Sequence, residues 1–496
     1  MPGPVHGKKA FRWCDHCGVL VLGEGCDLCG RLPRQFKVSF PGDLRPCPPR
    51  GMRDLGALLE RHFGKGDLLD GRPVFLNRIA GEDRTEEVVL EGRTIGVIRF
   101  DPRSNGLRMD LWKEGARLLS DAPRGVVDIK PTSRFVKGRN LGGDWILEMW
   151  GDFREGDPLV LRMGEEICAG VARASSDRAR EAERAIGVRD VAKGPDDLPA
   201  RDLSRKDLVR ANRSHLENIE SRAVSDIRSF MGNHKGREVT VSFSGGKDSL
   251  AAYGVTSEAV GEVPLLFANT GVEFPETVDF VHRFAEGRGI RLMEASAGEA
   301  FHRRLRELGP PAKDYRWCCK VCKLSPLSSL INERFPRGVI TVEGNRTYES
   351  FYRSEIGFVE RNPYVPGQTN LNPIRDWTAA EVWAYIWWKG MPYNPLYDED
   401  FQRVGCYLCP SQLASEARVT AELHPELYRD WEAFLLRWFG ERGADERYVR
   451  HGLWRWRRHP PKMVNLAREM GIPLPRVKGP GEQEEVLSRQ SMGGGD

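Results

Sequence analysis

The stretch that decides the fold is TVSFSGGKDSLAAYGV, residues 240–255. The β-branched and aromatic residues at its start predict a buried strand over 239–243, and the residues after the loop predict a helix. Glycines let the backbone approach a ligand closely, and the free N–H groups at the start of a helix attract phosphate. We therefore expect a phosphate group to bind at residues 244–249, where Lys247 adds a positive charge.

The loop is shorter than a Walker A loop and lacks the GxxxxGK[ST] spacing. The alternative is an ordinary strand-to-helix turn, which a Gly-Gly pair alone would also favour. The Lys-Asp-Ser that follows the glycines makes phosphate binding the better interpretation. The predicted phosphate-binding residues are Ser244, Gly245, Gly246, Lys247, Asp248 and Ser249.

Other continuous apolar runs accompany this strand along the chain. They are VPLLFAN (263–269), IRLMEA (290–295) and VITVEG (339–344), and helical segments separate them. Apolar runs that alternate with helices are typical of buried parallel strands. We therefore predict a doubly wound α/β domain with a parallel sheet, preceded by one helix over Ser204–Met231.

Four more stretches resemble a known family in the family's own order. They are FANTGVEFPETVDFV (267–281), VEGNRTYESFYR (342–353), LNPIRDWTAAEVWAYI (371–386) and MPYNPLYDEDFQRVGCYLC (391–409). With SFSGGKDS they resemble the phosphoadenosine phosphosulfate reductase family and the N-type ATP pyrophosphatases. The resemblance covers about residues 236–415, and it implies an adenine-nucleotide hydrolase-like fold and an enzyme that binds an adenine nucleotide.

The resemblance also implies further site residues. Asn269, Thr270 and Gly271 correspond to the adenine-side loop, and they follow a buried strand at the edge where α/β sheets bind ligands. Arg346 and Arg353 are seven residues apart, so we expect both near one helical face, where guanidinium groups suit anionic oxygens. The predicted catalytic residues are Lys247, Asp248, Lys323, Arg346 and Arg353.

Five cysteines fall in YRWCCKVCKLSPL (315–327) and CYLC (406–409). In the iron–sulfur branch of the family, a Cys-Cys pair and a distant CxxC hold one [4Fe–4S] cluster. The implied ligands are Cys318, Cys319, Cys406 and Cys409, with Cys322 as a further possible ligand. Spacing alone also allows zinc. If the fifth cysteine, Cys318 or Cys322, is uncoordinated and lies near Lys320 or Lys323, we expect its pKa to be lowered and its thiol to be reactive.

A second set of cysteines stands in CDHCGVLVLGEGCDLCG, residues 14–30. Two CxxC pairs, each followed by Gly, are typical of a zinc ribbon, and four thiolates leave no open position for catalysis. We therefore predict a structural zinc site over residues 11–35. Its ligands are Cys14, Cys17, Cys26 and Cys29.

Residues 90–192 resemble a PUA domain, which is an RNA-binding β-barrel. The resemblance rests mainly on GDFREGDPLVLRMGEEICAGVARAS (151–175), and an unrelated small barrel is the alternative. Residues 36–89 show no clear period and are described only as an uncertain α/β region. Residues 193–203 are rich in Pro, Gly and charge and predict a linker.

We place the catalytic domain at residues 204–415 and a helical region at 416–480, followed by a flexible tail at 481–496. The helical region contains HGLWRWRRHPPK (451–462). Interleaved Trp and Arg suit nucleic-acid binding, but the tryptophans could equally be core with the arginines as a solvated face.

Composition narrows the class of protein. The 496 residues are 40% hydrophobic and carry a net charge of only +4, so contact with nucleic acid would need local basic patches. The sequence shows neither a signal peptide nor an apolar run of about 18 residues. We therefore expect a soluble cytoplasmic protein of unknown oligomeric state.

Two enzyme reactions fit these features. A sulfonucleotide reductase of this family uses a cysteine nucleophile in a C-terminal tail, but no cysteine follows Cys409 here. We therefore favour an ATP-dependent, Mg²⁺-assisted sulfur transfer to RNA such as tRNA, in which a base is adenylated and sulfide displaces AMP. An RNA-binding protein with a regulatory nucleotide site is the third possibility.

Overall fold

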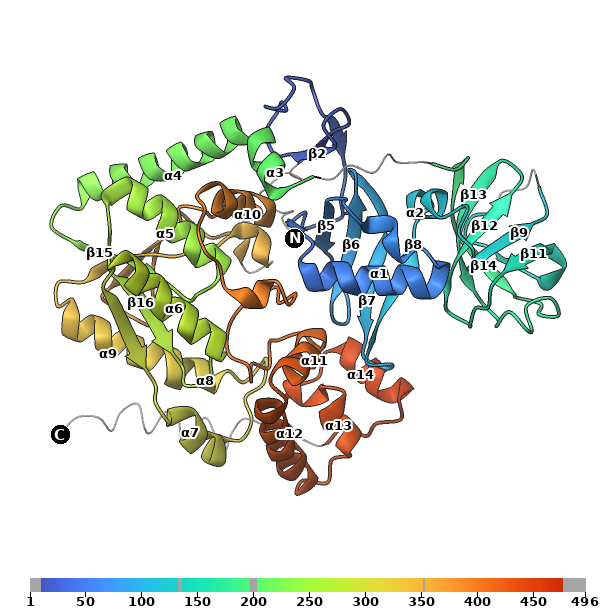
Figure 1. The fold of residues 1–496 in the computed structure, drawn as a ribbon. Coiled ribbons are helices and arrows are strands. Elements are labelled where there is room, and N and C mark those ends of the chain that lie inside the picture. The colour runs from blue at the N-terminus through green and yellow to red at the C-terminus, as the bar shows by residue number, and fades with distance from the viewer. Residues whose placement is uncertain (1–9, 133–135, 197–202, 351–352, 476–496) are drawn as a thin grey trace.

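The computed structural model describes residues 10–132, 136–196, 203–350 and 353–475. Figure 1 shows a domain with a largely parallel sheet on the left, two mainly antiparallel β units to its right and a bundle of short helices below. None of the described helices is both long enough and apolar enough to cross a membrane.

The chain begins with a small sheet of the order β2-β1-β3, built from Phe11–Cys14 (β1), Val19–Val21 (β2) and Arg34–Phe36 (β3). A second antiparallel sheet follows in the order β4-β5-β6-β7-β8. Its strands are Leu44–Pro46, Val74–Arg78, Thr85–Leu90, Arg93–Asp101 and Gly106–Leu111. Helix α1 (Pro49–Phe63) covers this sheet and buries Leu55, Leu59 and Phe63 against it.

The predicted domain boundary at residue 90 is wrong, because β6 and β7 form a hairpin in which Leu90 pairs with Arg93. The strand pattern of β6 is hidden in the sequence because Glu86 and Glu87 are fully buried. Arg45 and Arg84 neutralise Glu86 at 2.9 and 2.7 Å. Buried carboxylates with such partners break the alternation of apolar and polar residues that sequence analysis relies on.

Helix α2 (Lys113–Leu118) leads into a six-stranded sheet of the order β10-β14-β13-β12-β9-β11. Its strands are Val126–Ile129 (β9), Asn140–Leu141 (β10), Ile146–Trp150 (β11), Pro158–Met163 (β12), Glu166–Ala172 (β13) and Ile186–Lys193 (β14). The separate β unit therefore spans about 126–193 rather than 90–192. A small barrel is compatible with this sheet, and its PUA character stays a prediction.

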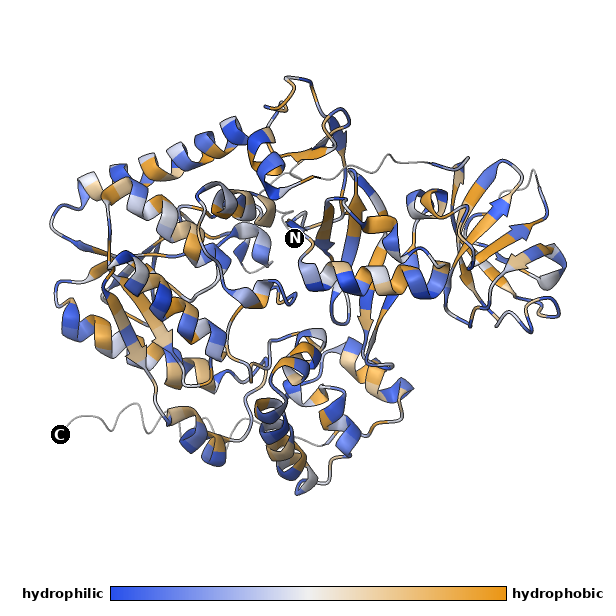
Figure 2. Cartoon of the chain, viewed as in Figure 1, coloured by the Kyte–Doolittle hydropathy of each residue, from blue (hydrophilic) through white to orange (hydrophobic). Residues whose placement is uncertain are grey.

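The third unit is the predicted α/β domain. Its sheet has the order β17-β16-β15-β18-β20-β19, parallel except for β19. The strands are Glu238–Ser242 (β15), Leu265–Asn269 (β16), Leu292–Ser296 (β17), Val339–Val342 (β18), Val359–Arg361 (β19) and Gln368–Leu371 (β20). The principal helices are α5 (Lys247–Val260), α6 (Pro275–Arg288), α7 (Ala300–Leu308), α9 (Ser325–Arg334) and α10 (Ala379–Trp388). Figure 2 shows the strands of this sheet as mainly hydrophobic, which confirms the fold class.

The helix expected over Ser204–Met231 is two helices, α3 (Arg205–Ala211) and α4 (Arg213–Asn233). Asn212 interrupts them because its side chain donates to Leu20 O at 2.8 Å and accepts from Leu22 N at 2.6 Å. A side-chain amide that pairs with backbone groups competes with helix formation. The hydrogen bonds of Asn212 at this break therefore connect the β1–β3 sheet to the helices of the α/β domain.

The chain ends in short helices: α11 (Ala414–Leu423), α12 (Pro425–Gly440), α13 (Glu446–Arg450) and α14 (Pro461–Glu469). Trp456 is buried, and Trp454 packs edge-on against Trp431 with 5.5 Å between ring centroids. Of the two interpretations of the Trp- and Arg-rich stretch, the structure supports tryptophans in a core.

Candidate functional site

The predicted phosphate-binding loop (residues 244–249), called the phosphate-binding loop below, lies at the carboxyl end of β15, and α5 begins at Lys247. Gly245 adopts φ +73°, a conformation that favours glycine. The N–H of Lys247 donates to the Tyr397 hydroxyl at 2.8 Å, and the Ser249 hydroxyl donates to Gly246 O at 2.8 Å. The loop is therefore held from both sides, with the start of a helix at its centre.

A chain of buried charges supports the loop. Lys247 Nζ lies 2.6 Å from Asp248 Oδ2, and Arg346 Nε lies 2.6 Å from Asp248 Oδ1. Burial lowers the pKa of Lys247. Burial also opposes ionisation of Asp248, but Arg346 and Lys247 outweigh it and lower the pKa of that carboxyl group to about 2. The loop therefore carries an ionised Asp248 between two cationic side chains.

Asp43 completes this chain from outside the α/β domain. Its carboxylate accepts from Arg346 Nη1 at 2.8 Å and from Nη2 at 3.0 Å, and it also accepts from Ala379 N at 2.6 Å. Asp43 lies between β3 and β4, 303 residues before Arg346. No motif in the sequence marks it, and sequence analysis missed it.

The expectation that Arg346 and Arg353 share a helical face is wrong. Arg346 is extended (φ −127°, ψ 141°), a single 3-10 turn over Thr347–Glu349 follows it, and it is buried beneath the loop. Arg353 instead pairs with Glu349 and lines the cavity described next. The two guanidinium groups therefore have different roles: one supports the loop, and the other faces ligand space.

A cavity of about 480 Å³ reaches from Ser244 of the loop to the second set of cysteines. Lys247 lines a separate cavity of about 210 Å³. Ser244 lines the loop side of the cavity, and Thr270 lies on the cysteine side with its Oγ1 3.3 Å from Cys406 Sγ. Lys323, Arg353 and Arg403 add positive charge. Arg403 was missed by sequence analysis although it lies within a family motif. Asn269 turns its side-chain amide toward Glu294 at 2.8 Å, and its Oδ1 accepts from Gly271 N at 3.0 Å. Asn269 and Gly271 therefore shape the carboxyl end of β16 and do not line the cavity.

Cysteines line the other end of the same cavity. Cys318, Cys319, Cys406 and Cys409 are half-buried, and Arg316 Nη2 lies 3.2 Å from the Sγ of Cys319. Cys322 also reaches the cavity, but it is 1% exposed and packs in the apolar core beneath it. Burial raises the pKa of Cys322 to about 11, and hydrogen bonding with Cys319 raises that of Cys318. Neither Cys318 nor Cys322 therefore has the lowered pKa that was expected of a reactive fifth cysteine.

The spacing of these thiols bears on the metal they could hold. Four thiolates on one zinc ion stand about 3.8 Å apart, given Zn–S bonds of about 2.3 Å. Among the described residues, this set does not form a group whose ligand atoms all lie within 4.8 Å. A [4Fe–4S] cluster binds each thiolate through a different iron, so its ligands stand further apart. As placed, the half-buried cysteines are therefore too widely spaced for one tetrahedral zinc ion.

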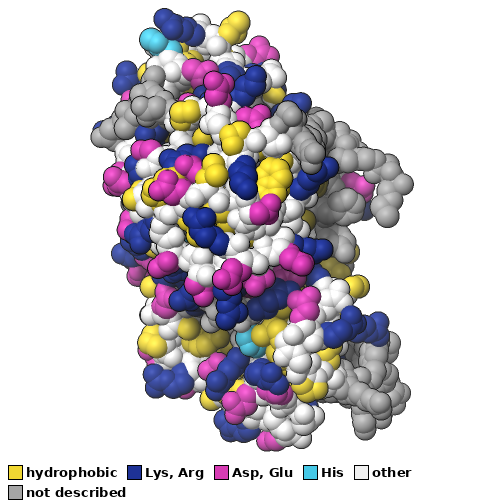
Figure 3. Space-filling model, turned by 90° about the vertical axis from the view of Figure 1, so that its right-hand side faces the viewer, with side chains coloured by type: hydrophobic (Ala, Val, Ile, Leu, Met, Phe, Trp, Pro, Cys, Tyr) yellow, Lys and Arg dark blue, Asp and Glu magenta, His cyan; other side chains and the backbone are white. Residues whose placement is uncertain are grey.

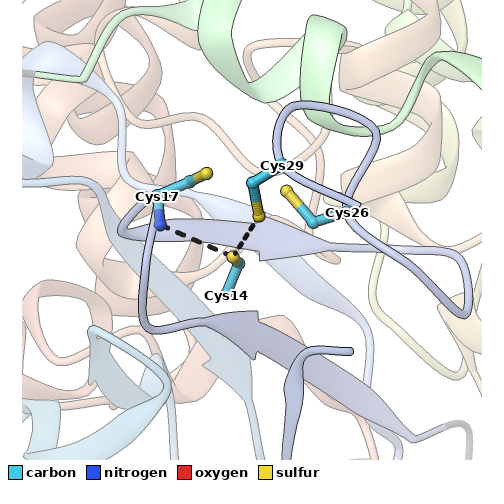
Figure 4. Close-up of side chains that lie close together, drawn as sticks. All are labelled: Cys14, Cys17, Cys26 and Cys29. Atoms are coloured by element: carbon cyan, nitrogen blue, oxygen red, sulfur yellow. Dashed lines mark hydrogen bonds between the residues drawn. The ribbon is translucent and has the colours of Figure 1, made fainter. Parts of the chain in front are cut away.

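The first set of cysteines is compact. Figure 4 shows Cys14, Cys17, Cys26 and Cys29 pointing toward one another, and their Sγ atoms all lie within 4.8 Å. Cys14 Sγ and Cys29 Sγ are 3.5 Å apart. This is a four-cysteine group of the size that a tetrahedral metal ion requires.

A glycine-rich loop at the carboxyl edge of a parallel sheet, beside a cationic cavity, defines a nucleotide-binding α/β protein. Residues 238–412 match the phosphoadenosine phosphosulfate reductase domain. The chain belongs to the phosphoadenosine phosphosulfate reductase family, and this membership suggests an enzyme that acts on nucleotides.

Relatives differ in how much of the chain they share. Uncharacterized protein MJ0066 of Methanocaldococcus jannaschii is 32% identical over 467 residues, which are 91% of this chain and 97% of that protein. Adenosine 5'-phosphosulfate reductase of Staphylococcus epidermidis is 25% identical over 197 residues, 39% of this chain and 79% of that protein. The phosphoadenylyl-sulfate reductase structure from Candida auris matches 39% of this chain and 95% of its own, with 19% identity and a TM-score of 0.30.

Proposed function

We propose that this chain is an ATP-dependent, iron–sulfur-containing sulfurtransferase that acts on RNA. The single observation that carries the proposal is the cavity itself, which Ser244 of the predicted phosphate-binding loop lines together with four half-buried cysteines. Lys323, Arg353 and Arg403 line the same cavity, where they would hold the phosphate groups of an adenylated substrate.

The reaction has two steps. A carbonyl oxygen of the base attacks the α-phosphorus of ATP, the bond from that phosphorus to the β-phosphate oxygen breaks, and pyrophosphate leaves with Mg²⁺. Sulfide then forms a bond to the base carbon, the C–O bond breaks, and AMP leaves with the former carbonyl oxygen. Carbon, sulfur and phosphorus keep their oxidation states, so the transfer needs no oxidant or reductant.

The side chains have separate tasks in these steps. Lys247 and the N–H groups at the start of α5 would hold the pyrophosphate group, and Arg346 would keep Asp248 and hence Lys247 in place. Of the four half-buried cysteines, Cys319, Cys406 and Cys409 would hold the iron–sulfur cluster, which would then supply an iron able to bind sulfide beside the nucleotide. Ligation by Cys318 as well would close that position. Cys14, Cys17, Cys26 and Cys29 would hold a structural zinc ion.

A sulfonucleotide reductase, the alternative, needs a nucleophilic thiolate. The residues after Cys409 contain no cysteine, and Cys322 is buried with a raised pKa, so its thiol is protonated at neutral pH. Neither position therefore offers a nucleophile in this chain. An RNA-binding protein with a regulatory nucleotide site is a further alternative, and it would leave RNA chemically unchanged.

RNA as substrate is supported by the extra units that precede the α/β domain. Figure 3 shows that one face of the molecule carries Lys and Arg interspersed with Asp and Glu. RNA contact on such a face would be made by local groups of basic side chains rather than by one uniform patch.

The test is anaerobic incubation of the iron-loaded protein with ATP, Mg²⁺, sulfide and bulk RNA, followed by mass spectrometry of the nucleosides. Parallel reactions contain adenylyl sulfate or its 3'-phosphorylated form with a thiol reductant. We expect a thiolated nucleoside that depends on ATP, with release of pyrophosphate. Sulfite release from either sulfonucleotide without RNA thiolation would establish the reductase instead. ATP-dependent RNA binding without a product would establish the regulatory alternative.

A further inference from the structure

A group of basic side chains, here called the Lys313 cluster, lies outside the cavity walls. It consists of Lys313 in the segment before Cys318, Arg78 at the end of β5, Arg455 just before α14, and Lys462 in α14. Lys313 N donates to Arg455 O at 2.7 Å, and Lys313 Nζ lies 4.3 Å from the Trp456 ring centroid. Segments that are distant in sequence therefore meet here, and the charges of Arg455, Lys462 and Arg78 all act on Lys313.

The nearby carboxylates are already engaged. Asp83 accepts from Ala414 N at 2.8 Å and Ser415 N at 3.1 Å, and it lies 3.5 Å from Arg455 Nη2. Glu416 accepts from Leu413 N at 3.0 Å and Gln402 N at 2.9 Å.

Lys462 Nζ donates to a backbone carbonyl, Gly81 O, at 2.9 Å. Among the described residues, no carboxylate lies within 4.0 Å of the charged nitrogens of Lys313, Arg78 or Lys462. The cluster therefore has an excess of positive charge.

This excess destabilises the charge on Lys313. Burial lowers the pKa of Lys313, and Arg455, Lys462 and Arg78 lower it further, against the opposing effect of Asp83, to about 7. Asp314, the neighbour of Lys313 in sequence, accepts from the backbone N–H groups of Arg457 and Arg458. An anion placed among these cations would restore the ordinary charge of the lysine.

The cluster borders the proposed active site. Pro311, two residues from Lys313, lines the cavity of about 480 Å³. Gln412 also lines this cavity, and its backbone carbonyl accepts from Arg455 Nη1 at 2.6 Å. We propose that Lys313, Arg78 and Lys462, supported by Arg455, form an oxyanion site that binds a phosphodiester group of a polynucleotide substrate beside the cavity. The identity of the substrate rests on the proposed function, whereas the oxyanion site rests on the cluster alone.

The experiment measures the modification of Lys313 itself, so anions bound at the phosphate-binding loop do not interfere. The full-length protein is treated with an amine-acetylating reagent between pH 5.5 and 9, and acetylation of Lys313 and Lys235 is followed by peptide mass spectrometry. Sulfate is the probe because it does not titrate in this range. Lys235, exposed at the turn after α4, is the internal control.

Without an anion, we expect the acetylation rate of Lys313 to rise with a midpoint near pH 7, far below the pKa of about 10.4 of an unperturbed lysine. Saturating sulfate should raise the midpoint by at least one pH unit, which slows acetylation at pH 7 about fivefold. An RNA oligonucleotide should do the same at much lower concentration than a mononucleotide. In the Arg78→Gln variant, protection by sulfate should weaken, whereas Lys235→Gln should leave it unchanged.

Two results would overturn the inference. If neither sulfate nor RNA changes the acetylation of Lys313, the cluster is not an oxyanion site. If sulfate protects and RNA does not, the site binds a free oxyanion and the polynucleotide assignment fails. Both readouts are independent of thiolation, so RNA protection without a thiolated product would contradict only the proposed reaction.

Discussion

Replacing Asp43 by asparagine removes one negative charge from beneath the phosphate-binding loop while it keeps the shape of the side chain. Arg346 is 2% exposed and shares its guanidinium group between Asp43 and Asp248. Removing one partner of a buried ion pair typically costs about 3–5 kcal/mol. The new amide oxygen can still accept from Ala379 N and from one Arg346 nitrogen. We therefore expect Asp43→Asn to lower the free energy of unfolding by about 2–4 kcal/mol.

The same substitution should weaken nucleotide binding, because Arg346 would turn its free nitrogens toward Asp248 and draw it from Lys247. We expect the Kd for ATP to rise about tenfold, which corresponds to about 1.4 kcal/mol. Once ATP is saturating, the rate of pyrophosphate release should fall less than the affinity does. This split distinguishes a positioning residue from general loss of structure, which would lower both in proportion to the unfolded fraction.

Denaturant unfolding and calorimetric ATP titration of the full chain measure the two effects. Asp15→Asn is the matched control, because Asp15 is also N-terminal and also pairs with an arginine, but its side chain is 60% exposed. Exposed pairs contribute about 0–1 kcal/mol, so this control should behave nearly as the native protein. If Asp43→Asn and Asp15→Asn have the same stability and the same ATP affinity, Asp43 does not support the loop.

Four further predictions address the loop and the cysteines. Lys247→Ala should slow pyrophosphate release by about 2–4 kcal/mol of activation free energy in a protein that still unfolds cooperatively; unchanged release would remove Lys247 from the site. Because the pKa of Asp248 is lowered to about 2 from an unfolded value of about 3.9, its stabilising effect is complete above pH 4 and is lost as the pH falls toward 2. Asp248→Asn should flatten that part of the pH–stability curve, and an unaltered slope would contradict the ion pairs. After anaerobic reconstitution, Cys319→Ala should lose the iron chromophore and Cys322→Ala should keep it; iron retained by both would exclude the proposed cluster. Cys26→Ser should reduce bound zinc, measured by elemental analysis, and a full zinc content in this variant would exclude the zinc ribbon.

The α/β fold was predictable because its signal is local. Buried parallel strands appear as continuous apolar runs, and the glycine-rich loop needs a backbone conformation that few other residues adopt. The β4–β8 sheet lacked such a signal. Its strand Thr85–Leu90 carries two glutamates at its centre, and these are tolerated only because Arg45, Arg84, Ser39 and Asn77 reach them from elsewhere. Secondary-structure propensity cannot reveal side-chain partners that come from distant parts of the chain.

The candidate site shows the same difference between local sequence signals and contacts of distant segments. The loop residues and the cysteines stand in motifs, so their types and spacing could be recognised. The different roles of Arg346 and Arg353 could not be recognised, because equal spacing on a presumed helix hides that one is extended beneath the loop. Asp43 and the Lys313 cluster are assembled from segments hundreds of residues apart, and only the folded chain shows that they meet.

Buried ion pairs join the N-terminal units to the α/β domain. Asp43 reaches Arg346, and Arg84 of the second sheet lies 2.7 Å from Asp400 in the segment that follows the Tyr397 contact to the loop. Asp400 is 5% exposed and would be left as a buried charge without Arg45 and Arg84. Deleting residues 1–192 would therefore expose unpaired charges within the catalytic domain, and loss of RNA binding by such a truncation would not separate substrate delivery from damage to the site. Substitutions on the surface of the 126–193 unit, away from these pairs, are the perturbations that can test RNA delivery on its own.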